Sequence, residues 1–540
     1  MKKKRAFVSF LMLISLATPL YAQEEKAVRL KADLVQIDVI VTDRQKRPIV
    51  DLRKEDFVLL EDGAPQLISF FTLVRPFSSS PSDQPNQVEA SSSDIQSEPG
   101  RFIFIILDQQ HISPSNYPRI RDALSRFISE DISSEDQVAV VSTSGRMAVF
   151  NQVTRNKRIL QVAINAFLGA GGGQNDAGFT LTAQDQSRLQ QGGSAASTDD
   201  LYREHVARNT YRSLEAIAKS VEEAPGRKIA ILISEDLPLL LSNDPFDTSG
   251  FDNFSYELQK VIGRSRRSGL VFYTVDPRGL TATIPGGNAA QYQGKSMLGG
   301  GGKSEDAGKQ GDYLLGSRIG MTQLAAATGG FAVFNTNDLR AGLNDVLDDN
   351  KSYYLLAYYP TDSAQDGKFR RIKVVVKNRP DLVVRTRSGY LAQDEKSGKI
   401  KQELKQQRIK NALAALMPLR HIKISILKAS ATKALEGRAA NMVVQIDARS
   451  WPFRQESGLR LGSLEVIGFA YDLSNRLANG FSKTVNMKLR PDVYARVCKE
   501  GINFRESIRL KKPGVYNLRV LVINNETGEM GTASEWVEVP

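Results

Sequence analysis

The middle of the chain, from about residue 101 to residue 350, alternates short apolar runs with amphipathic helical stretches. Runs such as "IAILIS" and "LVFYTV" are apolar at almost every position, which is typical of parallel strands covered by helices on both faces. The pattern therefore predicts a doubly wound α/β domain. Its strands are expected at 101–107, 137–143, 228–234, 270–275 and 331–334, and its helices at 117–130, 156–168, 200–223, 253–268, 318–328 and 336–349.

The segments on either side of this domain show the two-residue alternation of β-strands. Residues 27–76 contain three strands, which are too few to bury a reliable core alone. Residues 351–392 supply further strands, so we expect the two segments to pair, with the α/β domain inserted between two halves of one β-sandwich. Residues 418–540 alternate strands with turns at the spacing of an Ig-like sandwich.

Four further segments differ in composition from these folded regions. Residues 77–100 are rich in serine and proline, which predicts a linker, and residues 393–417 form a basic helical connector. Residues 169–197 and 284–312 are rich in glycine, and we interpret both as long loops that interrupt the α/β domain.

Residues 1–22 predict a secretory signal peptide. A basic start is followed by an apolar stretch from Phe7 to Leu20 and by small Ala22. The apolar stretch is shorter than the roughly 20 residues that a spanning helix needs, and no later segment approaches that length. The mature protein is therefore expected to be exported, to the periplasm or the medium, without an integral membrane segment.

Charge and cysteine content narrow the expected partners only slightly. The formal net charge is +12, and the leader holds four basic residues, which leaves +8 on the mature chain. This balance allows contacts with anionic surfaces, but nucleic acid is not expected for an exported protein. Cys498 is the only cysteine, so no intrachain disulfide can form.

Polar residues stand where strands of the predicted sheet end. Asp108 follows the first apolar run, Glu235 and Asp236 follow a later one, and Thr210 lies at the start of a predicted helix. Ligands of open parallel sheets collect at the carboxyl ends of the strands. Carboxylate and hydroxyl oxygens from several loops would suit a hard cation such as Mg²⁺.

At this point the sequence resembles a known family. The arrangement resembles a von Willebrand factor type A domain, and roughly residues 27–391 resemble the bacterial subgroup of von Willebrand factor A related proteins. The phrases that carry the resemblance are "VTDRQKRPIVDLRKEDFVLLEDGAPQLISFF", "LISEDLPL", "VFYTVDPRGL", "LAAATGGFAVFNTNDLRAGLNDVL", "SYYLLAYYP" and "FRRIKVVVK". The resemblance implies a Rossmann-like domain with a metal-ion-dependent adhesion site, where an aspartate, two serines, a threonine and a second aspartate hold the ion and a partner carboxylate completes the coordination.

The residues of this chain match that site only in part. Asp108 takes the position of the first aspartate, but Gln110 and Ile112 stand at the two serine positions. Thr210 fits the threonine, and Glu235, with its acidic neighbour, stands where the second aspartate is expected. The resemblance thus implies a degenerate site with weak Mg²⁺ binding or none, because Mg²⁺ requires near-ideal octahedral geometry.

A structural role is the alternative for Asp108. Its side chain would then cap the following turn by accepting hydrogen bonds from backbone N–H groups around Ser113. Asp276 is similarly expected to cap a turn at a strand end, together with Pro277 and Gly279.

The expected function is non-catalytic and adhesion-like: an exported protein that binds another protein through the top of its α/β domain. One alternative is an envelope scaffold in which the α/β domain is inert. The other is a secreted metal-dependent hydrolase, which would use Asp108, His111, Glu235 and Asp236 with an activated water.

Overall fold

The computed structural model describes most of the chain outside its N-terminal leader and its long insertions. It describes residues 34–45, 47–75, 101–144, 152–169, 198–222, 228–239, 254–280, 305–362, 368–386, 389–391, 405–434, 437–449, 451–473 and 475–540. The predicted signal peptide, the Ser/Pro-rich linker and the greater part of both glycine-rich segments lie outside these residues.

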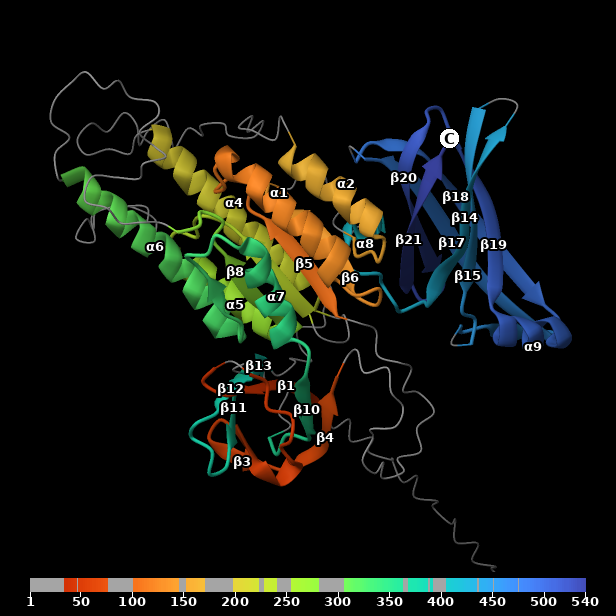
Figure 1. Ribbon diagram of the computed structural model, residues 1–540. Coiled ribbons are helices and arrows are strands. Elements are labelled where there is room, and N and C mark those ends of the chain that lie inside the picture. The colour runs from red at the N-terminus through yellow and green to blue at the C-terminus, as the bar shows by residue number, and fades with distance from the viewer. Residues whose placement is uncertain are drawn as a thin grey trace, which may run out of the picture.

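The architecture is mixed α/β together with antiparallel sheets (Figure 1). Its central element is a five-stranded parallel sheet of order β6-β5-β7-β8-β9. The strands are β5 (Phe102–Leu107), β6 (Gln137–Ser142), β7 (Lys228–Ile233), β8 (Leu270–Val275) and β9 (Ala332–Val333). Strands β5, β7 and β8 are buried at every position, because helices cover both faces of the sheet.

Two helical layers enclose this sheet, as Figure 1 shows. The first layer consists of α1 (Tyr117–Arg126), α2 (Lys157–Leu168) and α7 (Leu339–Asp349), and a π-helical turn, Phe127–Asp131, extends α1. The second consists of α4 (Thr198–Ser220), α5 (Ser255–Ser268) and α6 (Glu305–Thr328). The order of strands and helices agrees with the α/β domain predicted from the sequence.

The start of α6 differs from the prediction. The sequence predicted a helix only from residue 318, and residues 305–312 were assigned to the second glycine-rich loop. The structure begins α6 at Glu305. Two glycines and several polar residues in this first part hide the helical spacing of apolar positions, so the sequence pattern alone indicated a loop.

The N-terminal strands and the strands after α7 belong to two antiparallel sheets, of order β12-β1-β10-β4 and β13-β11-β2-β3. Strand β1 pairs with β10 from Val35 opposite Tyr358 to Val39 opposite Tyr354. One apolar cluster fills the space between the sheets. The strands are β1 (Val35–Thr42), β2 (Phe57–Glu61), β3 (Ala64–Gln66), β4 (Ile68–Val74), β10 (Tyr353–Tyr358), β11 (Phe369–Val376), β12 (Val383–Thr386) and β13 (Gly389–Leu391).

The C-terminal region also contains two antiparallel sheets, one of order β14-β15-β19 and one of order β16-β17-β20-β21, with β18 paired to β17. A shared core lies between them. The elements are β14 (Ile424–Ala434), β15 (Gly437–Ile446), β16 (Arg454–Glu456), β17 (Leu459–Asp472), β18 (Leu477–Leu489), α9 (Pro491–Glu500), β19 (Ile502–Leu510), β20 (Gly514–Asn524) and β21 (Met530–Val539). Helix α8 (Lys405–Ala414) precedes them and packs on β20 and β21.

Both β regions contact the α/β domain. Four partly buried residues of the C-terminal sheets, Tyr471, Leu473, Val515 and Trp536, pack against the apolar cluster that contains α1 and α2. The N-terminal β region contacts the domain through Asp349 at the end of α7, which forms an ion pair with Arg385 of β12 and accepts a hydrogen bond from Tyr273 of β8 at 2.6 Å.

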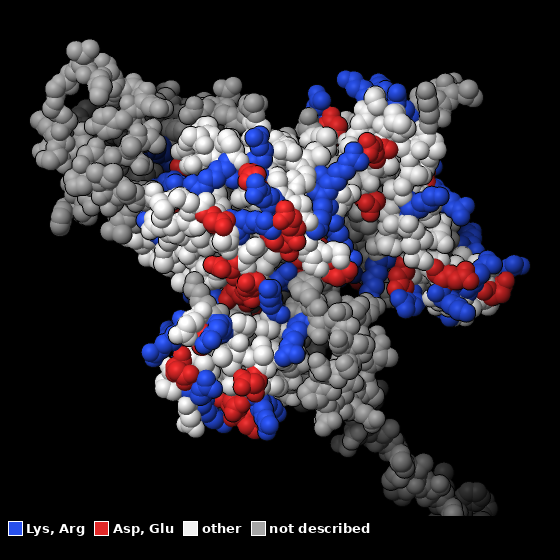
Figure 2. Space-filling model, in the orientation of Figure 1, with Lys and Arg blue, Asp and Glu red and all other residues white. Residues whose placement is uncertain are grey.

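Basic and acidic side chains are interspersed over the face of the molecule that Figure 2 shows, so the net positive charge does not form one continuous basic surface in that view. Among the described residues, no helix has both the length and the apolar character that a membrane crossing would require.

Gly320 determines how closely α6 can approach the segment that follows β7. A Cβ atom at this position would lie 2.0 Å from the carbonyl oxygen of Leu237. We therefore expect Gly320→Ala to lower the free energy of unfolding by about 2 kcal/mol or more, because backbone rather than a movable side chain would be displaced.

Denaturant unfolding measures this loss, and Gly263→Ala in α5 is the matched control. Its added Cβ would meet no atom closer than 3.8 Å, so the variant should gain about 0.5–1 kcal/mol from helix propensity. Equal effects of the two substitutions would contradict the close approach of α6.

Candidate functional site

The carboxylate of Asp108 lies fully buried at the end of β5 and accepts hydrogen bonds from four side chains. Its Oδ1 accepts from Thr143 Oγ1 at 2.7 Å and from Thr210 Oγ1 at 3.1 Å. Its Oδ2 accepts from Ser234 Oγ at 2.9 Å and contacts His111 Nδ1 at 2.8 Å. A carboxylate has about four acceptor positions, so these donors occupy its full capacity.

The register of the parallel sheet brings three of these residues together. Leu107, the last residue of β5, lies opposite Ser142 of β6 and opposite Ile233 of β7. The next residue of each strand, namely Asp108, Thr143 and Ser234, therefore emerges at one level of the same edge. Thr210 reaches this point from α4, which covers one face of the sheet.

His111 reaches Asp108 through the turn that follows β5. Its backbone N–H donates to the carbonyl oxygen of Asp108 at 3.0 Å, and the turn directs the ring back to the carboxylate three residues earlier. The His111 side chain is 11% exposed. The turn and the ring together close the strand end over a buried charge.

The two groups stabilise each other's charged forms. Burial opposes the charge on Asp108, but His111 and the hydroxyl donors outweigh it and hold the pKa of that carboxyl below its usual value. Burial likewise opposes the charge on His111, but Asp108 outweighs it, with Asp236 and Glu235 adding to the effect, and the pKa of His111 rises to about 8. Both shifts favour the imidazolium–carboxylate pair over the neutral forms of the two groups.

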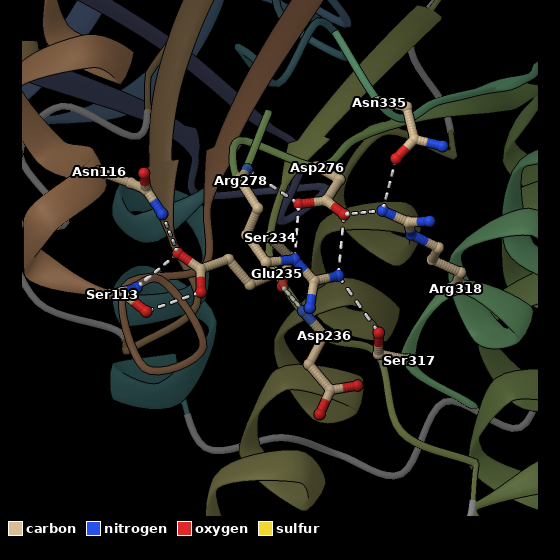
Figure 3. A network of polar contacts seen from close by, with 10 residues as sticks. All are labelled: Ser113, Asn116, Ser234, Glu235, Asp236, Asp276, Arg278, Ser317, Arg318 and Asn335. Carbon is tan, nitrogen blue, oxygen red and sulfur yellow. Dashed lines mark hydrogen bonds and ion pairs between the residues drawn. The ribbon is translucent and has the colours of Figure 1, made fainter. Parts of the chain in front are cut away.

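Glu235 binds the turn before α1 rather than Asp108. Its Oε1 accepts from the Ser113 backbone N–H at 2.7 Å and from Asn116 Nδ2 at 2.8 Å, and its Oε2 accepts from Ser113 Oγ at 2.7 Å (Figure 3). The prediction that Asp108 caps the turn around Ser113 is thus wrong. The turn is capped by a carboxylate, but that carboxylate belongs to Glu235, which follows β7.

A second buried acid lies at the end of β8. Asp276 Oδ1 accepts from the Arg278 backbone N–H at 3.0 Å, which confirms the predicted turn, and from Arg278 Nε at 2.9 Å. Its Oδ2 lies 2.8 Å from Arg278 Nη2 and 3.5 Å from Arg318 Nη2. Ser317 and Asn335 accept further bonds from these two guanidinium groups (Figure 3).

The structure brings only part of the predicted metal site together. The predicted ligands were Asp108, Gln110, Thr210, Glu235 and Asp236. Asp108 and Thr210 are in contact, whereas Gln110 is not among the partners of Asp108 and Glu235 binds the Ser113 turn. The backbone N–H of Asp236 donates to Ser234 Oγ at 3.2 Å, and the Asp236 side chain points away from the network that Figure 3 draws. Ile112 is buried in the core.

No group of three or more His, Cys, Asp or Glu residues within the described part of the chain is arranged to hold a metal ion. The sequence reasoning missed Thr143 and Ser234 and did not assign His111 to Asp108. Thr143 and Ser234 each directly follow an apolar strand, and this position could have indicated them. The position shows that they meet Asp108 only when the register of the strands is known, and the sequence does not give that register.

Comparisons with known proteins do not identify a family. No family model matches the chain, and no curated protein matches it. A Bacteroides uniformis beta-glucuronidase structure is similar over 35% of this chain and 19% of that chain, at 11% identity and a TM-score of 0.13. The PKD domain of human SorCS2 covers 23% of this chain and 75% of its own, at 21% identity and a TM-score of 0.12.

Dimeric latent PorU from Porphyromonas gingivalis is similar over 35% of this chain, at 13% identity and a TM-score of 0.13. This chain spans only 13% of the PorU chain and 19% of the glucuronidase chain. Likenesses this weak carry no functional argument, so the function must be argued from the site itself.

The raised pKa of His111 predicts that stability falls as the pH becomes alkaline. The folded protein holds the His111 proton above the usual pKa of 6.5, so this contribution is complete below about pH 6.5 and is lost as the pH rises through about 8. The shift corresponds to a free energy on the order of 2 kcal/mol. Asp108 acts in the opposite direction, and its contribution is lost as acid protonates the folded carboxyl.

Urea unfolding between about pH 5 and pH 9 measures this dependence. His111→Gln should be less stable than the wild type near pH 6 and should show a flatter profile on the alkaline side. An unchanged alkaline slope in His111→Gln would show that another group is responsible.

Proposed function

We propose that this chain is an exported, non-catalytic protein-binding protein, built around an α/β domain of the von Willebrand factor A type that recognises a protein partner at the carboxyl-end edge of its parallel sheet. The sheet order, the helices on both faces and an acid directly after the interior strand β5 support the proposal. Such edges are the usual ligand-binding position of open α/β sheets.

The proposal that the protein is not an enzyme rests on one observation, namely that the acidic side chains at this edge are hydrogen-bonded to donors of the same chain. Asp108, Glu235 and Asp276 each accept at least three hydrogen bonds from protein donors. A general base or nucleophile must be able to reach a substrate atom. The hydrolase alternative assigns Asp108, His111, Glu235 and Asp236 to a metal-bound water, but His111 contacts Asp108, and at least three acceptor positions of Asp108 and of Glu235 are taken by donors of the same chain.

Exposed apolar side chains support protein recognition at this edge. Tyr256 in the first turn of α5 is 66% exposed, and Leu280, which follows the turn after β8, is 67% exposed. Ile319 is 41% exposed and lies in α6 beside Arg318, which contacts the buried Asp276. Single exposed apolar residues are common, but three on elements that border one ligand-binding edge favour an apolar contact with a partner protein.

A scaffold remains the second candidate, and one observation favours it. The C-terminal sheets pack their partly buried residues against the α1 and α2 side of the α/β domain, and Arg158 of α2 forms an ion pair with Glu538 of β21 at 3.0 Å. A scaffold would use this joined body to hold other envelope components through its β regions.

Site-specific photo-crosslinking in the native host separates these two functions. A photoreactive residue at position 280 or 256 should form crosslinks to a protein partner, whereas one at position 427 should not. Leu427 is the matched control because it is 56% exposed on β14 of the C-terminal sheets. The partner identified by crosslinking is then used in a binding assay. The double variant Tyr256→Ser, Leu280→Ser should bind this partner about tenfold more weakly than the wild type does, or more weakly still, and its thermal stability should be unchanged.

The opposite pattern would overturn the proposal. Crosslinks from position 427 with none from positions 256 and 280 would favour the scaffold. Turnover of a substrate that is abolished by Asp108→Asn or Glu235→Gln would show that the edge is catalytic.

A further inference from the structure

The surroundings of Asp108 do not fit the hard cation that the family resemblance implies. Mg²⁺ takes close to six oxygen ligands at about 2.0–2.1 Å in octahedral geometry. Hydroxyls of Thr143, Thr210 and Ser234 do reach Asp108, but the fourth donor is the nitrogen of His111. A nitrogen that carries a proton toward the carboxylate competes with a cation for the same acceptor oxygen.

Two of the other expected positions cannot contribute a ligand beside Asp108. Ile112 occupies the second serine position and is buried among apolar residues of the α1 side, so it offers no oxygen. Glu235, at the position of the second aspartate, is held by the backbone N–H and the hydroxyl of Ser113 and by Asn116. Neither position therefore supplies an oxygen to an ion beside Asp108, and the His111 nitrogen occupies the place that such an ion would take.

We infer that the His111 side chain takes the place of the divalent cation, as a counter-ion that the chain itself supplies to the buried Asp108, so that the edge is closed to metal and recognises its partner without one. The ring comes from the turn directly after Asp108 and contacts Oδ2 at 2.8 Å, and Glu235 and Asp236 contribute further negative charge around it. A tethered cation also needs no ion from the medium.

The inference goes beyond the proposed function, because it concerns which group compensates the buried charge of Asp108. It does not depend on which partner the edge binds. It has one consequence that a purely structural histidine would not have. Removal of the imidazole should leave a carboxylate and three hydroxyls around an opening, and this oxygen-only arrangement should bind a hard cation.

Ion titration of the mature protein and its variants by calorimetry and thermal unfolding tests the inference. The wild type should bind neither Mg²⁺ nor Mn²⁺ at this site. His111→Ala should be strongly destabilised, because it leaves a buried charge unpaired, and it should recover stability on addition of Mn²⁺ or Mg²⁺. An ion at ten times its dissociation constant should shift the unfolding equilibrium of this variant about tenfold.

His205→Ala is the matched control, because its ring contacts Asn209 within α4 and not Asp108. This variant should show no ion dependence. The double variant His111→Ala, Asp108→Asn removes both charges, so it should be more stable than His111→Ala in the absence of metal and should not respond to ions. It also keeps the test decisive if His111→Ala alone does not fold.

Two results would overturn the inference. One is binding of Mg²⁺ or Mn²⁺ by the wild type that Asp108→Asn abolishes, which would make Asp108 a metal ligand beside the histidine. The other is a double variant no more stable than His111→Ala, which would show that the imidazole does not compensate the Asp108 charge. Loss of partner crosslinking would not affect either result, so the two proposals fail separately.

Discussion

The buried charge of Asp108 is the constraint on which the carboxyl-end edge of the sheet depends. An isolated carboxylate in an apolar interior is too costly to persist unless donors and an opposite charge compensate it. Here β6, β7, α4 and the turn after β5 each supply one donor. The carboxylate thereby joins four segments of the chain at one point, and a change in the position of any of them would remove one of the donors that compensate the buried charge.

The three acidic side chains of this edge are stabilised by different kinds of donor. Asp108 faces an imidazole, Asp276 faces the guanidinium groups of Arg278 and Arg318, and Glu235 is held by neutral donors at the turn before α1. Each arrangement links a strand end to the segment that follows it or to a neighbouring helix. Each of the three buried carboxyl groups is therefore held by several polar contacts at once.

Polar contacts also join the α/β domain to the N-terminal sheets. Asp349 joins Tyr273 of the parallel sheet to Arg385 of β12, so the end of α7 connects the core of the α/β domain to the N-terminal sheets. The strands of those sheets come from both sides of the inserted domain. Because β1 pairs with β10 across more than three hundred residues, this pairing closes a very long loop, and we expect it to follow folding of the α/β domain.

The sequence by itself determined the order and type of most elements, since an apolar run that is buried on both faces and a helix with one apolar stripe leave a local periodic signal. It also determined the Asp276 turn, which depends on residues two positions apart. It placed Thr210 at the same site as Asp108, but it did not determine the start of α6, helix α9, the Glu235 cap at Ser113 or the contacts of Thr143, Ser234 and His111 with Asp108. The contacts of Glu235 and Asp108 join residues up to 126 positions apart in the sequence. Only the register of β5, β6 and β7 and the packing of α4 decide which polar side chains meet, because local propensity carries no information about distant partners.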